Sequence, residues 1–161
     1  MGETEDKELT RARNAAYRLL TYRPRSRKEL EDKLRDKEFP ASIVASVIDH
    51  VTRLGYLNDA TFARQWAESR VRHRGFGKRR IAQELKAKGI DLELIGETLK
   101  GLFEEATEAD IARKEAEKKL KTMVRFEPEV RRRRLAGFLE RKGFSFEVIR
   151  ATIYDLVRSK H

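Results

Sequence analysis

The chain contains no cysteine, only three prolines and only three histidines. Without cysteine there are no disulfides, no thiolate chemistry and no cysteine-based zinc site. The histidines, at positions 50, 73 and 161, lack a metal-ligand spacing such as His-x-x-x-His. Acidic pairs occur throughout so charged a chain and carry no information. We therefore expect no catalytic residues, no metal and no cofactor, and a protein that is not an enzyme.

Long hydrophobic runs and strand patterns are absent as well. No apolar stretch approaches the roughly 20 residues that a membrane-spanning helix needs. Residues 1–8 contain four acids and one lysine, unlike a signal peptide. We expect a cytoplasmic protein with no membrane partner, and a disordered segment at 1–8, which has no apolar periodicity. From Leu9 onward the spacing of apolar residues is that of helices.

The most informative positive feature is a hydrophobic pattern that occurs three times, with the steps 4, 5, 4, 1, 3, 1 and 3 in each copy. The copies are offset by 51 and then by 54 residues. Their members are Leu30, Leu34, Phe39, Ile43, Val44, Val47, Ile48 and Val51; Ile81, Leu85, Ile90, Leu94, Ile95, Thr98, Leu99 and Leu102; and Leu135, Leu139, Phe144, Val148, Ile149, Thr152, Ile153 and Leu156. Such a repeat predicts units that share buried faces with their neighbours in an extended array.

The fold class that this pattern predicts is all-α, with three tandem three-helix repeats forming an elongated, curved array. We place the repeats at 9–56, 57–103 and 104–161. Alanine pairs mark the first helix of each, at 12 and 16, 63 and 67, and 112 and 116. From the first unit to the third, the alanine pair is offset by 100 residues but the hydrophobic pattern by 105. The link between the first two helices is therefore five residues longer in the third unit. Helix starts are predicted by a Ser26–Glu29 capping box and by Asp91 and Pro128.

The charge is basic and unevenly distributed. The chain has 37 Lys and Arg against 27 Asp and Glu, a formal net charge of +10. Residues 64–90 contain nine basic and two acidic residues, 91–110 one basic and seven acidic, and 111–134 ten basic and four acidic. This banding predicts separate basic and acidic faces. A basic surface favours polyanions or an acidic protein face as partner.

The candidate binding residues are basic and fall in two groups. The first surrounds the Gly75-Phe76-Gly77 turn, and the second occupies the predicted start of the second helix in units 1 and 3. They are Arg70, Arg72, Arg74, Lys78, Arg79, Arg80, Lys86 and Lys88, and then Arg27, Lys28, Arg132, Arg133 and Arg134. Unpaired N–H groups and the dipole make a helix start suitable for phosphates or carboxylates. The alternative is that these cations are only solvated.

Two aromatic residues lie in the basic segment, where an aromatic side chain either packs in the core or contacts a ligand. Phe76 could stack on a base, but we expect it to pack between units. Trp66 lies on a helical stripe with Phe62, and we expect both in the core.

The middle of the chain resembles the signature of the RecX family of bacterial recombination regulators. The matching residues are Leu57 to Arg64, Ser69-Arg70, and Arg74 through Ile90. The segments Ala15 to Leu20 and Ser26 to Leu30 are similar to the first unit of that family. Lys78 departs from the pattern, since the family often has proline after the Gly-x-Gly turn. The resemblance covers essentially residues 10–158.

This resemblance implies a protein that lies in the helical groove of the RecA–DNA filament and bridges RecA protomers. It implies inhibition of RecA ATPase, strand exchange and coprotease activity, and hence a role in recombination, repair and the SOS response. It also implies binding to single-stranded and double-stranded DNA with little sequence preference. We expect a monomer, because no heptad seam or large apolar patch is evident.

Two alternatives remain open at this level. A sequence-independent DNA binder would use the same basic residues directly on DNA. A sequence-specific helix-turn-helix factor is disfavoured, since the basic runs contain few Asn or Gln side chains to hydrogen-bond bases.

Overall fold

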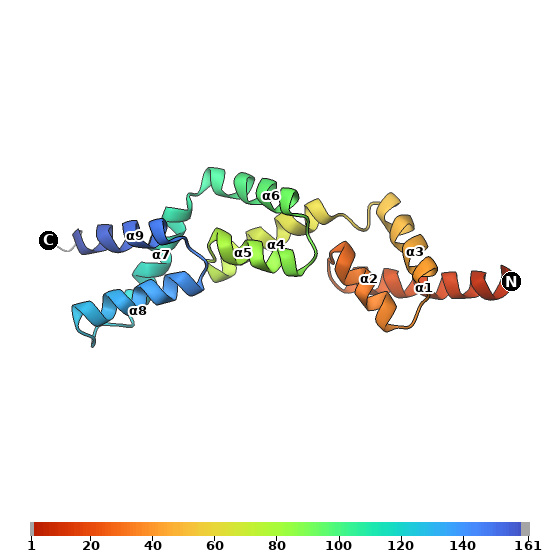
Figure 1. Cartoon of the computed structure of the whole chain (residues 1–161), viewed down its shortest axis with the longest axis horizontal. Coiled ribbons are helices and arrows are strands. Elements are labelled where there is room, and N and C mark those ends of the chain that lie inside the picture. Colours follow the sequence, from red (N-terminus) through yellow and green to blue (C-terminus); the bar gives the residue numbers. More distant parts are fainter. Residues whose placement is uncertain (1, 159–161) are drawn as a thin grey trace.

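The computed structural model describes residues 2–158, in which nine helices and no strand are found. The helices are α1 (Gly2–Tyr22), α2 (Arg27–Asp36), α3 (Ala41–Arg53), α4 (Asp59–Arg74), α5 (Lys78–Ala87), α6 (Leu92–Glu105), α7 (Glu108–Leu120), α8 (Pro128–Arg141) and α9 (Phe146–Arg158). Figure 1 shows them as three groups of three that follow one another along the long axis. The predicted fold class is therefore confirmed.

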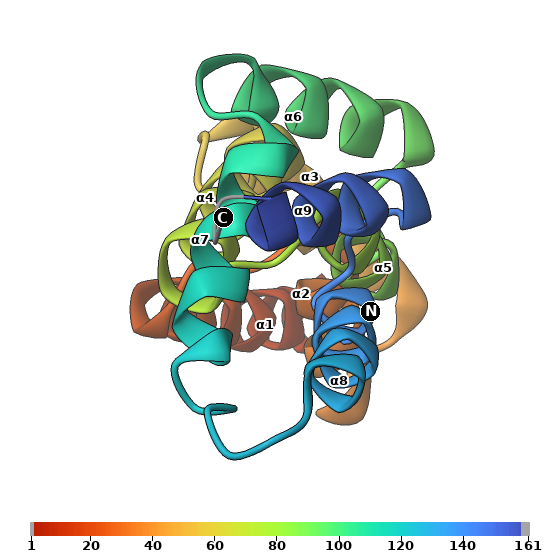
Figure 2. The ribbon, with the colours of Figure 1, turned by 90° about the vertical axis from the view of Figure 1, so that its left-hand side faces the viewer.

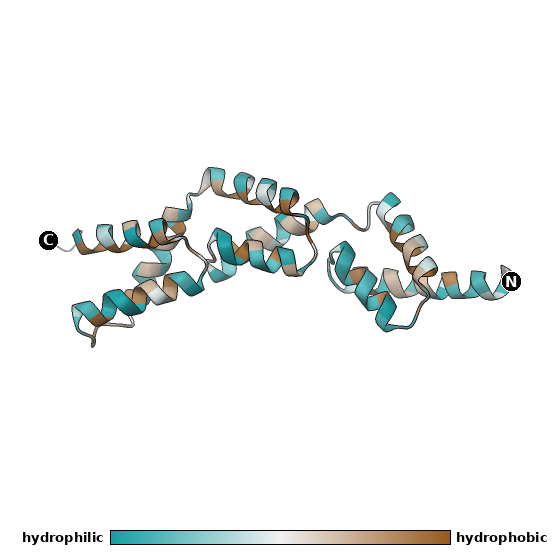
Figure 3. Cartoon of the chain, viewed as in Figure 1, coloured by the Kyte–Doolittle hydropathy of each residue, from teal (hydrophilic) through white to brown (hydrophobic). Residues whose placement is uncertain are grey.

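Each group of three helices has its own small core. All positions of the repeated hydrophobic pattern are buried or partly buried, and none is exposed. The three alanine pairs of α1, α4 and α7 are fully buried, which lets the first and third helices of each unit approach closely. In Figure 3 the hydrophobic residues face inward within each group, and the outer faces are mostly hydrophilic. Thin cores of this kind explain how a chain with 40% charged residues folds.

The predicted helix starts are largely as expected. Ser26 and Glu29 form a reciprocal capping box at α2, and the Asn58, Asp91 and Thr107 side chains cap α4, α6 and α7. Pro128 occupies the first turn of α8. Pro40 is the N-cap residue of α3.

The N-terminal segment differs from its prediction. Residues 2–8, expected to be disordered, form the first turns of α1, so that expectation is wrong for these residues. They continue, without apolar contacts of their own, a helix whose residues from Leu9 to Leu20 pack on the core. Glu3 and Glu5 complement the positive end of its dipole. Met1 lies outside the described residues. The boundary expected at residue 103 falls inside α6, which continues to Glu105.

The second helices of the three units are joined head to tail. The carbonyls of Lys142 and Gly143, just after α8, accept hydrogen bonds from Gly77 N (2.8 Å) and Arg79 N (3.1 Å) at the start of α5. Likewise the carbonyl of Lys88, after α5, accepts a bond of 2.6 Å from the Ser26 hydroxyl at the start of α2. Figure 1 shows α8, α5 and α2 in this order along the array. Each junction therefore aligns two helix dipoles with opposite ends in contact.

Candidate polyanion-binding surface

The starts of α2 and α5 are not open anion sites. Besides the carbonyl contacts of Gly77 and Arg79, the Lys78 N–H donates to the Glu108 carboxylate (3.1 Å), and the Arg27 N–H to Asp59 (2.8 Å). Oxygens of the chain itself thus occupy the positions that an anion would take. The interpretation of these helix starts as free phosphate or carboxylate sites is wrong, because a repeat neighbour fills them.

The third unit departs from the predicted equivalence. Its second helix, α8, begins at Pro128, and its first turn carries Glu129. Arg132, Arg133 and Arg134 therefore follow the first turn, which closes with the hydrogen bond from the Arg131 N–H to the Glu127 carbonyl (2.9 Å). They do not line the helix start as the sequence pattern had indicated. The longer link of this unit allowed the extra turn to form.

Several predicted binding residues are used inside the protein. Arg70 Nε donates to Glu84 (3.0 Å) and lies 4.4 Å above the Trp66 ring. The Trp66 indole N–H reaches the same carboxylate at 3.1 Å, and Lys88 Nζ lies 4.8 Å from its ring centre. Trp66 is partly buried against the core of unit 2, as expected. Arg70 and Lys88 thus have structural partners.

Phe76 is a packing residue, as preferred from the sequence. It is 6% exposed, and the guanidinium of Arg80 lies 4.1 Å above its ring. Arg80 also donates to the Arg141 carbonyl (2.9 Å), and Lys142 approaches the same ring at 5.7 Å. A ring so enclosed by cations of two units cannot receive a base without opening the junction. Phe76 and Arg80 therefore hold units 2 and 3 together.

The basic residues at the start of α2 are partly neutralised. Arg27 pairs with Glu31 (3.1 Å) and Lys28 with Asp32 (3.0 Å), each one turn further along the helix. The Lys28 side chain also packs against Gly89 of the next unit. Exposed pairs like these contribute little stability, but they reduce the net charge that unit 1 presents.

Five predicted residues of unit 2 remain exposed without an ion-pair partner among the described residues. We call them the unit 2 cation surface: Arg72, Arg74, Lys78, Arg79 and Lys86. Arg79 and Lys86 are seven positions apart on α5, on the side opposite buried Ile81 and Leu85. Arg133 of α8 is likewise exposed and unpaired in the described part of the chain.

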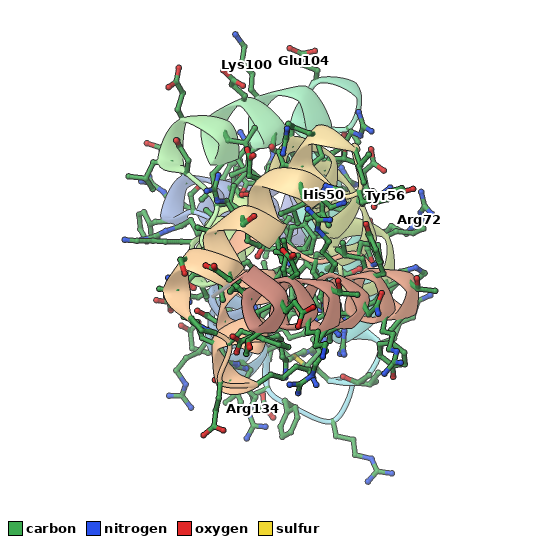
Figure 4. The ribbon with its side chains drawn as sticks, turned by 90° about the vertical axis from the view of Figure 1, so that its right-hand side faces the viewer. His50, Tyr56, Arg72, Lys100, Glu104 and Arg134 are labelled. Atoms are coloured by element: carbon green, nitrogen blue, oxygen red, sulfur yellow. The ribbon has the colours of Figure 1, made fainter. Side chains whose placement is uncertain are left out.

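The candidate residues do not form one continuous patch. Viewed along the array in Figure 4, Arg72 and Arg134 point away from the axis in different directions. Lys100 and Glu104 of the acidic band lie on a third side, over α6. The predicted separation of basic and acidic faces thus corresponds to different sides of an elongated body, with the basic residues distributed over more than one side.

The junction of units 1 and 2 contains an electrostatic cluster that the sequence analysis did not single out. Glu29 accepts from Arg23 (2.5 Å), from the Ser26 N–H (3.3 Å) and from Lys88 (3.4 Å). Burial raises the pKa of Glu29, but these hydrogen bonds and the charges of Lys88 and Arg23 outweigh it, so its pKa lies below the usual range. Glu29 was recognised only as a capping residue, because its contact with Lys88 spans two units.

Arg25 and Lys142 were also missed. Arg25 is buried and donates to the Leu19 carbonyl (3.1 Å), and its pKa is lowered by burial and by the charge of Arg23. Lys142 donates to Glu115 (3.3 Å) and to the Arg74 carbonyl. One signal was available for it: Lys142 precedes Gly143 as Lys88 precedes Gly89, so both lysines end a second helix at a junction.

No helix within residues 2–158 is long and apolar enough to cross a membrane. The same described residues contain no cluster of three or more His, Cys, Asp or Glu side chains that could hold a metal ion.

The architecture and its cations define an all-helical repeat protein of three three-helix units joined end to end, with a strongly basic surface. Family models place it more narrowly. The first, second and third three-helix domains of RecX match residues 12–50, 58–99 and 106–153, respectively. The chain belongs to the RecX family.

Named relatives agree with these matches. The chain is similar to the regulatory protein RecX of Streptomyces lividans, at 38% identity over 144 residues, which are 89% of this chain and 76% of that one. It is also 38% identical, over 154 residues, to the regulatory protein RecX of Thermobifida fusca, covering 93% and 78% of the two chains. These names support a regulatory role for the chain.

Solved structures support the fold. The crystal structure of RecX from Lactobacillus salivarius has a TM-score of 0.84 at 26% identity and covers 94% of this chain and 97% of that one. A second crystal structure of a regulatory protein RecX has a TM-score of 0.83 at 22% identity, which speaks for the fold alone.

Proposed function

We propose that this protein binds the RecA–DNA filament along its helical groove and inhibits RecA ATPase, strand exchange and coprotease activity. It would thereby modulate homologous recombination, DNA repair and the SOS response. The observation that carries the proposal is the end-to-end array of three units with the unit 2 cation surface at its centre. The chain would act in the cytoplasm as a monomeric, non-enzymatic regulator.

The shape suits a long, repetitive partner. Because the units are joined through α8, α5 and α2 in line, successive units present their surfaces at intervals along one axis. A partner with its own repeat, such as a filament, can contact several units at once, and the effective concentration of the second contact then raises the overall affinity. An elongated inhibitor of this kind would also bridge adjacent RecA protomers.

The charge distribution suits a partner with both acidic and basic surfaces. The unit 2 cation surface would face acidic RecA residues or DNA phosphates. The exposed acids of α6 include Glu93, Glu97 and Glu104. Glu104 lies on another side of the array in Figure 4, and these acids would face basic RecA residues or solvent. Arg70, Arg80 and Lys88 have internal partners and would support this surface indirectly.

The second candidate is a sequence-independent DNA-binding protein that acts on DNA itself. The observation that favours it is the same set of unpaired cations, because release of counterions by Lys and Arg requires no protein partner. Its binding to single-stranded and double-stranded DNA would weaken steeply with salt and show little dependence on sequence.

The test is the ATPase rate of preformed RecA filaments on single-stranded DNA, with DNA in excess and salt near physiological strength. We expect inhibition at well below one molecule per DNA-binding site. The double variant Arg79→Gln/Lys86→Gln should raise the half-inhibitory concentration about tenfold, the effect of two weakened charge contacts. Inhibition only when the protein covers the free DNA would favour the second candidate.

The matched control is Lys33→Gln/Arg35→Gln on α2, which removes the same charge from two exposed residues of unit 1. We expect its half-inhibitory concentration to stay within about twofold of the parent protein. An equal loss in both double variants would mean that overall charge decides, and would contradict the assignment to unit 2. Circular dichroism should show unchanged helicity in both.

A further inference from the structure

The third unit contains a basic pocket. It has a volume of about 390 Å³ and lies between α7, α8 and the link that joins them. Its walls include Lys119, Thr122, Phe126, Arg133, Arg134 and Arg141. Figure 2 shows this link at the free end of the array, where it loops below α7 and α8. Of these residues, only Arg133 and Arg134 were expected to bind a ligand.

The longer link of unit 3 builds one wall of this pocket. Its residues fold into consecutive turns, with the Met123 N–H bonded to the Leu120 carbonyl (3.0 Å) and the Phe126 N–H to the Met123 carbonyl (3.1 Å). The Arg131 side chain fixes the end of the link by donating to the Phe126 carbonyl (2.8 Å). The five additional residues thus have a defined conformation that places Phe126 beside α8.

Gly137 opens the floor of the pocket. It lies in the middle of α8, where glycine is unfavourable relative to alanine. A Cβ there would come within 3.2 Å of the Arg141 guanidinium and meet nothing else outside its own helix and its chain neighbours. The backbone at this position has no need of glycine, since its φ is negative, as in the rest of the helix. Its effect is to leave room beside three arginines.

The pocket concentrates positive charge without compensation. None of its four cations forms an ion pair with a carboxylate among the described residues, although exposed cations elsewhere do, such as Arg113 with Glu117 at 3.2 Å. The Arg134 guanidinium is positioned 4.1 Å above the Phe126 ring, and Lys119 lies 5.2 Å from the Phe138 ring. Aromatic faces hold the cations in place but leave their donors free.

We propose that this pocket binds a phosphate group, and that its source is the backbone of a nucleic acid lying across unit 3. Guanidinium groups offer paired donors that match phosphate oxygens. Here they converge from one face of α8 while Lys119 approaches from α7, so the donors reach a tetrahedral anion from several sides. The proposal rests on the DNA binding of the second candidate function, but it does not depend on RecA, because it concerns the ligand of the isolated protein. A free nucleotide is the other source of the same chemistry.

The test uses the full chain and a fluorescently labelled single-stranded DNA of mixed sequence, with anisotropy measured over a range of salt concentrations. The variant Gly137→Glu adds a carboxylate at the floor of the pocket and improves helix propensity. Circular dichroism should show unchanged helicity, so that a loss of binding is not caused by unfolding. We expect the Kd of this variant to rise about tenfold and the salt slope to fall by about 0.7 for each phosphate that the protein no longer neutralises. The double variant Arg133→Gln/Arg141→Gln should behave in the same way.

Two variants serve as matched controls. Gly137→Ala adds the Cβ without the charge, and Ala151→Glu adds the same charge at an exposed position of α9. Both should bind DNA within about twofold of the parent protein. If Ala151→Glu weakens binding as much as Gly137→Glu, or if Gly137→Glu has no effect, the pocket is not a phosphate site and the proposal fails.

The source is distinguished by amide NMR spectra of Gly137 and Thr122 during titration with DNA, with inorganic phosphate and with ATP. Shifts that saturate with DNA at lower concentration than with ATP support the nucleic-acid backbone. Tighter saturation by ATP keeps the phosphate chemistry and overturns the backbone as its source. No shift with any of the three overturns the proposal. Filament inhibition measured on the same variants can fail or persist independently of these outcomes.

Discussion

The second helices of the three units end in the same backbone conformation, a residue of positive φ, but they differ in that residue and in its surroundings. After α5 and α8 the chain turns at Gly89 (φ 78°) and Gly143 (φ 93°), whereas after α2 it turns at Glu38 (φ 66°). A Cβ on Gly143 would lie 2.4 Å from Arg80 N, and one on Gly89 would lie 2.5 Å from the Lys28 side chain. Glu38 is exposed, and no other unit among the described residues packs against it.

This difference shows that glycine is required here by the neighbouring unit as well as by the turn. All three residues have positive φ, which a non-glycine residue adopts at a cost of about 1 kcal/mol. Only the two glycines also lie against a residue at the start of the preceding second helix, Lys28 for Gly89 and Arg80 for Gly143. The residue after helix two therefore reports whether another unit is docked on it.

The largest effect should come from breaking the junction of units 2 and 3. Gly143→Ala places a Cβ against the backbone of Arg80, which cannot move away without breaking the hydrogen bonds from Gly77 and Arg79. We expect a loss of about 3 kcal/mol or more in the free energy of unfolding, from the positive φ and the overpacking together. Urea denaturation measures it. Gly89→Ala should cost less, because it meets a side chain instead of backbone; the reverse order would contradict this account.

The junction of units 1 and 2 should be weakened next through Glu29. Because its pKa is lowered in the folded protein, its contribution is present at neutral pH and is lost as the pH falls through the folded-state pKa. Glu29→Gln should cost about 1–2 kcal/mol at pH 7, because its charge-assisted hydrogen bonds are weakened. Its stability should also depend less on acid pH than that of the parent protein.

The check is a series of urea denaturation curves between neutral pH and pH 3. Glu31→Gln is a suitable control, since Glu31 pairs with Arg27 alone in the described part of the chain and is more exposed than Glu29 on the same helix. Equal pH profiles for the parent protein and Glu29→Gln would show that the cluster around Glu29 does not stabilise the junction.

The smallest effect should appear at the free end of the array. Glu38→Gly removes the strain of positive φ without touching another unit, while glycine loses more entropy on folding. We expect a gain of about 0.5 kcal/mol, measured as a shift of the urea midpoint, the net of those two opposing costs. A clear loss of stability would contradict this expectation and would mean that the Glu38 side chain makes a stabilising contact although it is exposed.

Much of the fold could be predicted because each unit is held together by residues close in sequence. The hydrophobic spacing, the alanine pairs and the capping residues are local signals, and the structure confirms them. The expectation of disorder was wrong for residues 2–8, because a helix anchored by Leu9 onward extends into this polar segment without apolar contacts. Local composition does not contain that information.

The candidate site was less predictable for the same reason. A run of Arg and Lys gives the charge of a surface but not the partner of each side chain. Arg70 and Lys88 were included with Arg79 and Lys86, yet the first two contact Trp66 and carboxylates inside the protein. In the sequence, the starts of α2 and α5 resemble anion sites, but in the structure the next unit packs against them.

The sequence by itself determined that this protein is a basic array of three three-helix units, because hydrophobic spacing and helix caps act within a few turns of the chain. The tertiary structure alone decided how the units join, because the contacts of Ser26 with Lys88 and of Gly77 with Lys142 connect residues more than sixty positions apart. At these junctions some cations are bound by groups of the chain itself, and others remain exposed. The residues available to a partner are therefore set by the junctions.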